Sequence, residues 1–218
     1  MKNYFLIFLI LFSFNINAQE IKDLTFSAGI NMANLTYGSD IKDALDAMDA
    51  TTKAVIGISV SADASFELSD VLDLNTGLSF MQKGGGYSID GVDGDILTKM
   101  NFLEINPSLS YNFSDEFSLD FGPYVGYALS GTQTILDFDM TTGNSTTDDE
   151  AINFEDDEIN RIDLGVNVGF SYLINEMINV SAGYSLGFAD LNSGDQADLD
   201  QSIKTNGIRF SLGYCIQY

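Results

Sequence analysis

Carboxylates are the side chains of this sequence that could most readily do chemistry, because 32 Asp and Glu residues stand against 9 Lys and Arg residues. Asp90, Asp93 and Asp95 form the most site-like group, in the stretch DGVDGD at 90–95. Closely spaced carboxylate oxygens can bind Ca²⁺, so these three residues are a candidate calcium site. Their spacing is not that of an EF-hand loop, and we favour the alternative of a solvated, self-repelling surface. We expect no resident cofactor.

The composition excludes several kinds of catalysis. Because the chain has no His, it cannot form a Ser-His-Asp triad, a Cys-His pair or a His-ligated metal site. The net charge of −23 disfavours nucleic acid as a partner, since phosphate binding requires a basic surface. We therefore expect a protein without enzymatic activity.

The elements that would position any functional side chain are strands of alternating polarity. The last residues, IRFSLGYCIQY at 208–218, are large and apolar at every even position and end on an aromatic residue, as outer-membrane barrels commonly do. Such period-2 alternation is typical of a strand with one apolar face. Similar patterns predict eight strands, at 23–37, 53–67, 72–83, 98–113, 117–135, 160–173, 177–189 and 204–218.

The connections between these strands alternate in length. Those after the second, fourth and sixth strands are a few residues, whereas 38–52, 84–97, 136–159 and 190–203 are long and hold 20 of the 32 acidic residues. Short turns at one rim and long loops at the other are the plan of an outer-membrane barrel. The sequence thus predicts an all-β fold, an eight-stranded antiparallel transmembrane β-barrel with short periplasmic turns and long acidic extracellular loops.

A soluble β-sandwich or lipocalin-like barrel is the competing interpretation, because alternation alone fits both. The second face of the strands discriminates between them. In 117–135 this face is small and weakly polar, with residues such as Ser118, Gly122 and Gly126, where a solvated face would carry many Lys and Glu. Such residues suit the crowded lumen of a narrow barrel, so we favour the membrane barrel.

Side chains alternate between the two faces of a strand, and this parity of odd and even positions places several charged residues inside the barrel. An eight-stranded barrel has room for side chains and little else, so we interpret these charges as paired groups that fill the lumen. A path for a substrate or ion is the alternative. We expect Arg209 to pair with Glu104 or Asp163. The inward charges are Arg209, Glu104, Asp163, Asp120, Lys83, Asp73 and Arg161.

Several stretches resemble the PorT-like family of small outer-membrane β-barrel proteins of Bacteroidetes. They are FSAGINMANL at 26–35, GLSFMQKG at 77–84, FLEINP at 102–107, FGPYVGY at 121–127 and IDLGVNVGF at 162–170. The resemblance implies the barrel fold, an outer-membrane location and, from the founding member, a link to type IX secretion. The family usually reads Tyr-Leu-Glu-Ile-Pro-Leu in its fourth strand. Here Asn106 separates Ile105 from Pro107, which leaves the register open at that point.

Residues 1–18 have the features of a secretory signal peptide, with a short charged head, an apolar run at 4–14 and the small residue Ala18 before the cut. The run is shorter than the roughly 20 residues of a membrane anchor. We expect cleavage after Ala18 and a single outer membrane β-barrel domain at 19–218. Sec-type export would carry it to the outer membrane, where lipid is its expected partner and other envelope proteins are candidates.

Loop 38–52 carries one further pattern, a helical spacing of apolar residues. Ile41, Ala44, Leu45 and Met48 follow Ser39, a candidate N-cap, so we predict a short amphipathic helix at the barrel mouth. Taken together, the sequence indicates a structural or interaction role exerted through the acidic loops. An accessory role in an envelope machine, such as type IX secretion, and a small solute channel are the alternatives.

Overall fold

The computed structural model describes residues 21–217 except 93, 140–143, 157 and 195–198. The expected signal peptide and Asp93 of the acidic group lie outside the described residues. The described part contains one α-helix, one 3₁₀ helix and eleven strands. Their bounds are β1 (Ile21–Tyr37), α2 (Ser39–Ala47), β2 (Ala50–Lys53), β3 (Val55–Ser69), β4 (Leu72–Ile89), β5 (Asp95–Ile105), β6 (Ser108–Asn112), β7 (Phe117–Asp139), β8 (Asn144–Ala151), β9 (Ile162–Ile174), β10 (Ile178–Gly187), η1 (Leu199–Gln201) and β11 (Ile203–Gln217).

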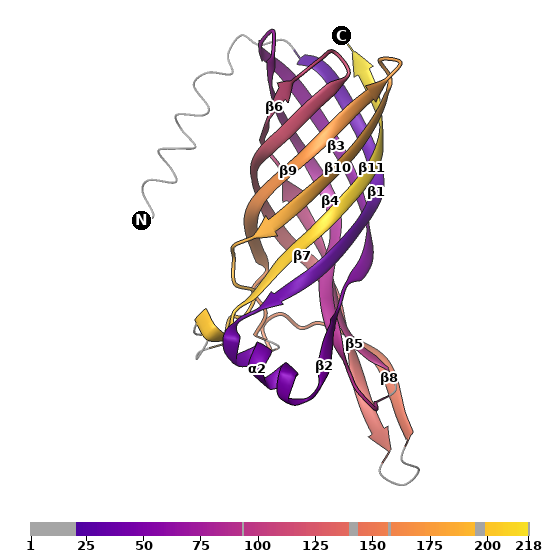
Figure 1. The fold of residues 1–218 in the computed structure, drawn as a ribbon, viewed down its shortest axis with the longest axis vertical. Helices are drawn as coiled ribbons and strands as arrows, with labels where there is room; N and C mark the ends of the chain where they lie inside the picture. The colour runs from indigo at the N-terminus through magenta and orange to yellow at the C-terminus, as the bar shows by residue number, and fades with distance from the viewer. Residues whose placement is uncertain (1–20, 93, 140–143, 157, 195–198, 218) are drawn as a thin grey trace.

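The strands close into an antiparallel ring (Figure 1). Around the ring the order is β3, β1, β11, β10, β9, β7, β5 and β4, and β4 pairs again with β3. The short strand β6 shares the position of β5, because both pair with β4 on one side and β7 on the other. The wall therefore has eight strand positions, which confirms the predicted eight-stranded antiparallel barrel. β1 and β11 form the closing seam, in register from Asp23↔Gln217 to Tyr37↔Ile203.

The break between β5 and β6 falls at Asn106 and Pro107, where the sequence left the register open. Pro107 has no N–H to donate to a ladder, so it ends the pairing of β5. The Asn106 side chain donates to Ser79 Oγ at 2.7 Å and so ties the break to β4. A Cβ on Gly122 would lie 2.0 Å from the Pro107 carbonyl oxygen, so only glycine lets β7 approach the break this closely.

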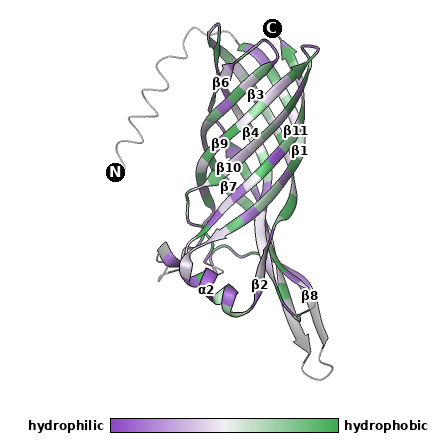
Figure 2. Cartoon of the chain, viewed as in Figure 1, coloured by the Kyte–Doolittle hydropathy of each residue, from purple (hydrophilic) through white to green (hydrophobic). Residues whose placement is uncertain are grey.

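The outer surface of the barrel is apolar. Large side chains such as Phe26, Ile58 and Leu212 are about half exposed, at 52%, 53% and 59%. Figure 2 shows hydrophobic and hydrophilic residues alternating along the strands, as expected when one face meets lipid and the other the lumen. Near the short turns, Phe117 stacks on Phe170 with centroids 5.8 Å apart, and Phe113 lies 5.6 Å from Phe117. These rings occupy the place of an interfacial aromatic girdle.

Two of the predicted long loops are in large part strand. β4 continues to Ile89 and β5 begins at Asp95, while β7 and β8 form a hairpin that projects beyond the barrel rim (Figure 1). The prediction of loops at 84–97 and 136–159 is wrong for these residues. The reason is that ladder hydrogen bonds continue past the membrane, where lipid no longer imposes an apolar face and the alternation that marks a strand disappears.

The predicted helix exists as α2, but its first residue is Ser39 and its N-cap is Gly38, so the prediction of a Ser39 cap is wrong. The Ser39 hydroxyl instead donates to Asp200 Oδ1 at 2.8 Å and thereby connects α2 to η1. Leu45 is the buried residue of the helix. Among the described residues, none of the helices has the length and hydropathy needed to cross a membrane.

Candidate functional site

The inner faces of the strands create two different environments along the lumen. In the half nearer the long loops, Lys83 on β4 reaches two carboxylates. Its Nζ lies 2.6 Å from Glu104 Oε1 on β5 and 2.9 Å from Asp163 Oδ2 on β9. All three side chains are at most 2% exposed. We call these residues, with Tyr124 and Thr205, the ionic plug.

Register explains why the two carboxylates meet. Glu104 and Asp163 are both partners of Gly126 on β7, one on each side. A Cβ on Gly126 would lie 3.2 Å from Glu104 Cγ, so the absence of a side chain leaves room for both acids. Two carboxylates this close require a shared cation, and Lys83 supplies it.

Asp163 is the best-supported acid of the ionic plug. Its Oδ2 accepts hydrogen bonds from Thr205 Oγ1 at 2.7 Å and from the Tyr124 hydroxyl at 3.1 Å. The Tyr124 ring also faces the ammonium group, with Lys83 Nζ 3.9 Å from the ring centroid. Because a desolvated ammonium is stabilised by both carboxylates and aromatic faces, these contacts favour a charged Lys83.

An apolar cluster covers the ionic plug toward the long-loop rim. Ile152 and Phe154 follow β8 in the chain and fold back into the barrel mouth, where Ile152 N donates to Gly131 O at 3.0 Å. The Arg161 guanidinium lies 4.1 Å from the Phe154 ring and donates to the Ala128 carbonyl. Tightly packed apolar side chains exclude water, so within the described part of the chain this cluster obstructs the mouth. The cluster consists of Leu35, Met100, Phe102, Ala128, Ile152, Phe154 and Leu191.

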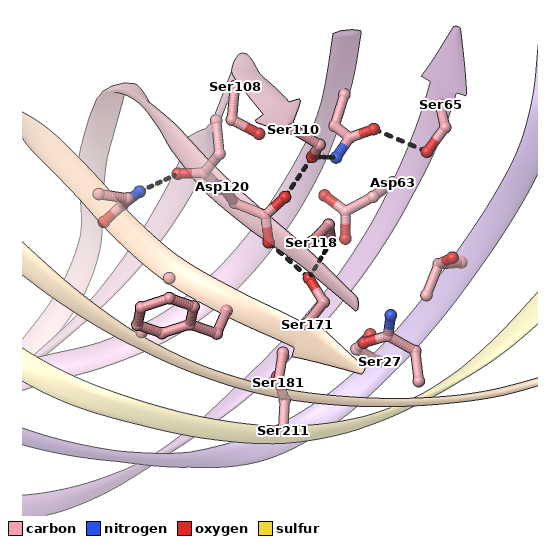
Figure 3. Close-up of a pocket in the computed structure, with 18 of the residues that line it drawn as sticks. Ser27, Asp63, Ser65, Ser108, Ser110, Ser118, Asp120, Ser171, Ser181 and Ser211 are labelled. Carbon is pink, nitrogen blue, oxygen red and sulfur yellow. Dashed lines mark hydrogen bonds between the residues drawn. The ribbon is translucent and has the colours of Figure 1, made fainter. Parts of the chain in front are cut away.

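The half nearer the short turns is hollow. A cavity of about 260 Å³ extends inward from the rim that carries both ends of the barrel, and serine is the commonest residue type in its lining (Figure 3). We call it the vestibule. Its existence corrects the expectation that the whole lumen is filled by side chains. The physical reason is side-chain size, because the inward residues are small here and large in the ionic plug. The serines include Ser27, Ser65, Ser108, Ser118, Ser181 and Ser211.

Asp120 lies in the vestibule at the centre of a hydroxyl network. One of its oxygens accepts the Ser110 hydroxyl and the other accepts the Ser171 hydroxyl (Figure 3). Ser110 in turn accepts a hydrogen bond from Asn75 Nδ2. Because each carboxylate oxygen has a donor, Asp120 is held as a fixed, satisfied charge.

Arg209 also lines the vestibule, and the predicted pairing of Arg209 with Glu104 or Asp163 is wrong. Lys83 pairs with both of those acids, while Arg209 lies in a different row of the barrel wall. Arg209 instead lines the vestibule together with Asp63 of β3. All five luminal charges singled out from the sequence (Arg209, Glu104, Asp163, Asp120 and Lys83) therefore lie on the inner side of the barrel, but they divide between the two halves.

At the mouth of the vestibule, Asp73 forms a separate ion pair. Its Oδ2 lies 2.7 Å from Lys22 Nζ and accepts a hydrogen bond from Asn112 Nδ2 at 2.9 Å. The pair ties the start of β1 to β4 and β6. Lys22 is 41% exposed, so this is a rim contact of modest energy.

The sequence singled out neither Tyr124 nor Thr205 nor Asp63. The alternation in 117–135 puts Tyr124 on the same face as Gly122 and Gly126, but the face alone does not tell whether a side chain fills space or contacts Lys83. Thr205 lies near the start of β11, before the clear alternation begins. Alternation could have identified Asp63 as an inward residue, because Asp63 falls on the inner face of 53–67.

Two members of the candidate calcium group, Asp90 and Asp95, lie in the described part of the chain. Asp95 lies 3.7 Å from Lys53 Nζ, and Asp90 is in the turn between β4 and β5. Among the described residues no group of three or more His, Cys, Asp or Glu side chains could hold a metal ion. Asp93 lies outside the described residues.

A closed antiparallel barrel with an apolar outer surface and a polar lumen is the architecture of a membrane β-barrel. The family comparison agrees with this class. The model of the outer membrane protein beta-barrel domain family matches residues 12–193, and the chain belongs to that family. The protein is accordingly an outer membrane β-barrel protein.

Solved structures of similar fold include three bacterial outer-membrane proteins. Ail, the attachment invasion locus protein of Yersinia pestis, is 10% identical with a TM-score of 0.47, over 90% of this chain and 100% of Ail. Neisserial surface protein A is 13% identical with a TM-score of 0.47, over 89% and 97%. OprG from Pseudomonas aeruginosa is 12% identical with a TM-score of 0.41, over 94% and 100%. No curated protein sequence matches the chain.

Proposed function

We propose that this outer-membrane barrel has a structural or interaction role exerted through its long-loop rim, and that it catalyses no reaction. The proposal treats the chain as a PorT-like protein that reaches the outer membrane by Sec-type export after removal of residues 1–18. The observation that carries it is the closure of the lumen. Because the ionic plug and the apolar cluster fill the long-loop half, the surface that the protein offers outward is its rim and not a pore.

The β7–β8 hairpin is the part of this rim best suited to reach a partner. It projects beyond the barrel (Figure 1), and β8 pairs only with β7 among the described strands. The exposed Asp148, Asp149 and Glu150 give its β8 strand a negative charge. A basic partner surface would be complementary to this strand, since opposite charges speed association and fix register.

The test is co-purification after mild detergent extraction, with a trimmed variant as the comparison. Gln133 and Glu150 are register partners, so residues 134–149 can be replaced by the two-residue turn Asn-Gly without straining the ladder. We expect partners of the full chain to be lost from the trimmed variant while its barrel still folds. A second variant, Asp148→Asn with Asp149→Asn, separates the contribution of charge from that of shape. Partners that bind the trimmed variant equally well would contradict the proposal.

The same co-purification tests the first alternative, an accessory role in an envelope machine such as type IX secretion. That role is favoured by the stretches that resemble PorT-like proteins, and it requires a stable complex with other envelope components. Recovery of only lipid and the chain itself would argue against it.

A small solute channel is the remaining alternative. A channel requires a continuous water path, and the buried Lys83, Glu104 and Asp163 lie across the lumen. We expect no conductance steps from the full-length barrel in planar bilayers. Steady openings would revive the channel and displace the proposed role.

A further inference from the structure

The vestibule has no part in the proposed function, because it opens at the opposite end of the barrel from the long loops. Its volume of about 260 Å³ lies just below the range of ordinary small-molecule sites. An occupant must therefore be small. Its chemistry can be read from the charges that line the walls.

Glycines create the free space beside Arg209. Arg209 of β11 is the register partner of Gly183 on β10. Gly183 is also the partner of Gly169 on β9, which in turn pairs with Asp120 on β7. A positive and a negative side chain are thus separated by two positions without side chains. Asp63 reaches into the same space from the other side of the seam, on β3 (Figure 3).

Two charged groups in this space keep unused binding capacity. Asp63 Oδ2 accepts the Ser61 hydroxyl at 2.7 Å, but its Oδ1 accepts no hydrogen bond from the described residues. Among the described residues Arg209 forms no ion pair within 4.0 Å, and it lines the same cavity as Asp63. By contrast, the oxygens of Asp120 both have hydroxyl donors. The free groups are therefore one carboxylate oxygen and one guanidinium.

We propose that the vestibule binds a small zwitterion of the amino-acid class, with its ammonium group on Asp63 and its carboxylate on Arg209. Serine hydroxyls both donate and accept, so the surrounding walls can hydrogen-bond either end of such a solute. A guanidinium is suited to bidentate recognition of a carboxylate. The site faces the periplasmic side in the expected orientation of the barrel.

The other simple occupants fit less well. The lining contains six acidic and two basic residues, so a plain anion is disfavoured, and a plain cation would leave Arg209 without a counter-charge. A metal ion lacks ligands, because among the described residues no three acids converge closely enough to hold one. Water alone would fill the volume, but it would leave the two free charges with only solvent as a partner.

The test compares three probes of similar size on the full chain refolded in detergent. L-Alanine carries both charges, ethylamine only the positive one and propionate only the negative one. Binding is followed by chemical-shift changes at the amides of β3 and β11. We expect L-alanine to bind with saturation and the other two probes to bind at least about tenfold more weakly, because each loses one charge-assisted interaction.

Variants identify the groups that hold the ligand. Asp63→Asn and Arg209→Gln should each weaken L-alanine binding about tenfold or more. Asp63→Asn should not weaken the binding of propionate, which has no ammonium group to contact Asp63. Asp70→Asn, in the β3–β4 turn outside the vestibule, is the control for the same change of net charge.

Several results would overturn the proposal. They are the absence of saturable shifts up to about 10 mM L-alanine, equal binding of ethylamine or propionate, or equal loss in the Asp70→Asn control. Folding of each variant is checked by its heat-dependent mobility on a gel. If a variant does not fold, the comparison of the three probes on the natural chain still decides the matter.

Discussion

The two halves of the lumen are built on the same eight strand positions yet have opposite contents. The ionic plug is filled by large inward side chains, of which Tyr124 and Lys83 are at most 2% exposed. The vestibule is lined by serines and by glycines such as Gly183, which leave a cavity of about 260 Å³. The barrel backbone sets only the diameter of the lumen. The size and charge of the inward residues decide whether a given level is closed or hollow.

The difference also predicts how each half responds to mutation. In the ionic plug, water cannot replace a lost partner, so a deleted hydrogen bond or charge leaves a buried group unsatisfied. In the vestibule, water can take the place of a deleted hydroxyl. The same chemical change should therefore cost much more in one half than in the other.

The largest effect is expected from Lys83→Met. Removing the cation leaves Glu104 and Asp163 as two adjacent buried acids without a counter-charge. Loss of one member of a buried ionic cluster typically costs about 3–5 kcal/mol. Urea unfolding of the barrel in lipid vesicles measures this loss. The control is Lys53→Met, which breaks the exposed 3.7 Å pair with Asp95 and should cost less than about 1 kcal/mol. Equal losses would show that the cluster contributes no more than a surface ion pair.

A smaller effect is expected from single hydroxyls. Thr205→Val keeps the side-chain shape but removes the 2.7 Å donor to Asp163, and we expect a loss of about 1.5–3 kcal/mol in the free energy of unfolding. Ser171→Ala removes a donor to Asp120 in the vestibule, where water has access, and should cost about 1 kcal/mol or less. Urea unfolding of both variants checks the comparison. Similar losses would mean that the vestibule is as dry as the ionic plug.

Much of the fold follows from the sequence because lipid imposes a regular constraint. Residues such as Phe210 and Leu212 must alternate with inward residues along every membrane-spanning stretch, so the eight strand positions and the β1–β11 seam can be predicted. Outside the membrane the constraint ends. Stretches such as TTDDE at 146–150 do not alternate in hydropathy, and the strand β8 was therefore missed.

The candidate site is harder to predict for a geometric reason. Parity tells which face a side chain occupies, but not its height along the barrel axis. Heights depend on the stagger between strands, which shifts at irregularities such as the one between Asn101 and Phe102. Arg209 and Lys83 both face inward, and only the folded structure shows that Lys83 Nζ lies 2.9 Å from Asp163 Oδ2. For this reason parity indicates that Arg209 and Lys83 face inward but does not identify their partners, and the expected pairing of Arg209 is wrong.

Glycine packing gives the smallest and most specific comparison of the two halves. A Cβ on Gly165 would lie 2.6 Å from Tyr124 Cε1 and 2.2 Å from the Leu186 carbonyl oxygen, inside the region of the ionic plug. A Cβ on Gly183 would meet its nearest atom, the Val168 carbonyl oxygen, at 3.2 Å beside the vestibule. We expect Gly165→Ala to cost about 1–3 kcal/mol through overpacking and Gly183→Ala to stay within about 0.5 kcal/mol.

Urea unfolding of these two alanine variants measures the difference directly. The Gly183→Ala variant carries a second readout, because its methyl group narrows the space between Arg209 and Asp120 without greatly disturbing the wall. Weaker L-alanine binding with unchanged stability would indicate that the ligand occupies the space beside Arg209. If instead Gly183→Ala destabilises the barrel as much as Gly165→Ala does, the lumen is close-packed along its whole length, and the distinction between the two halves does not hold.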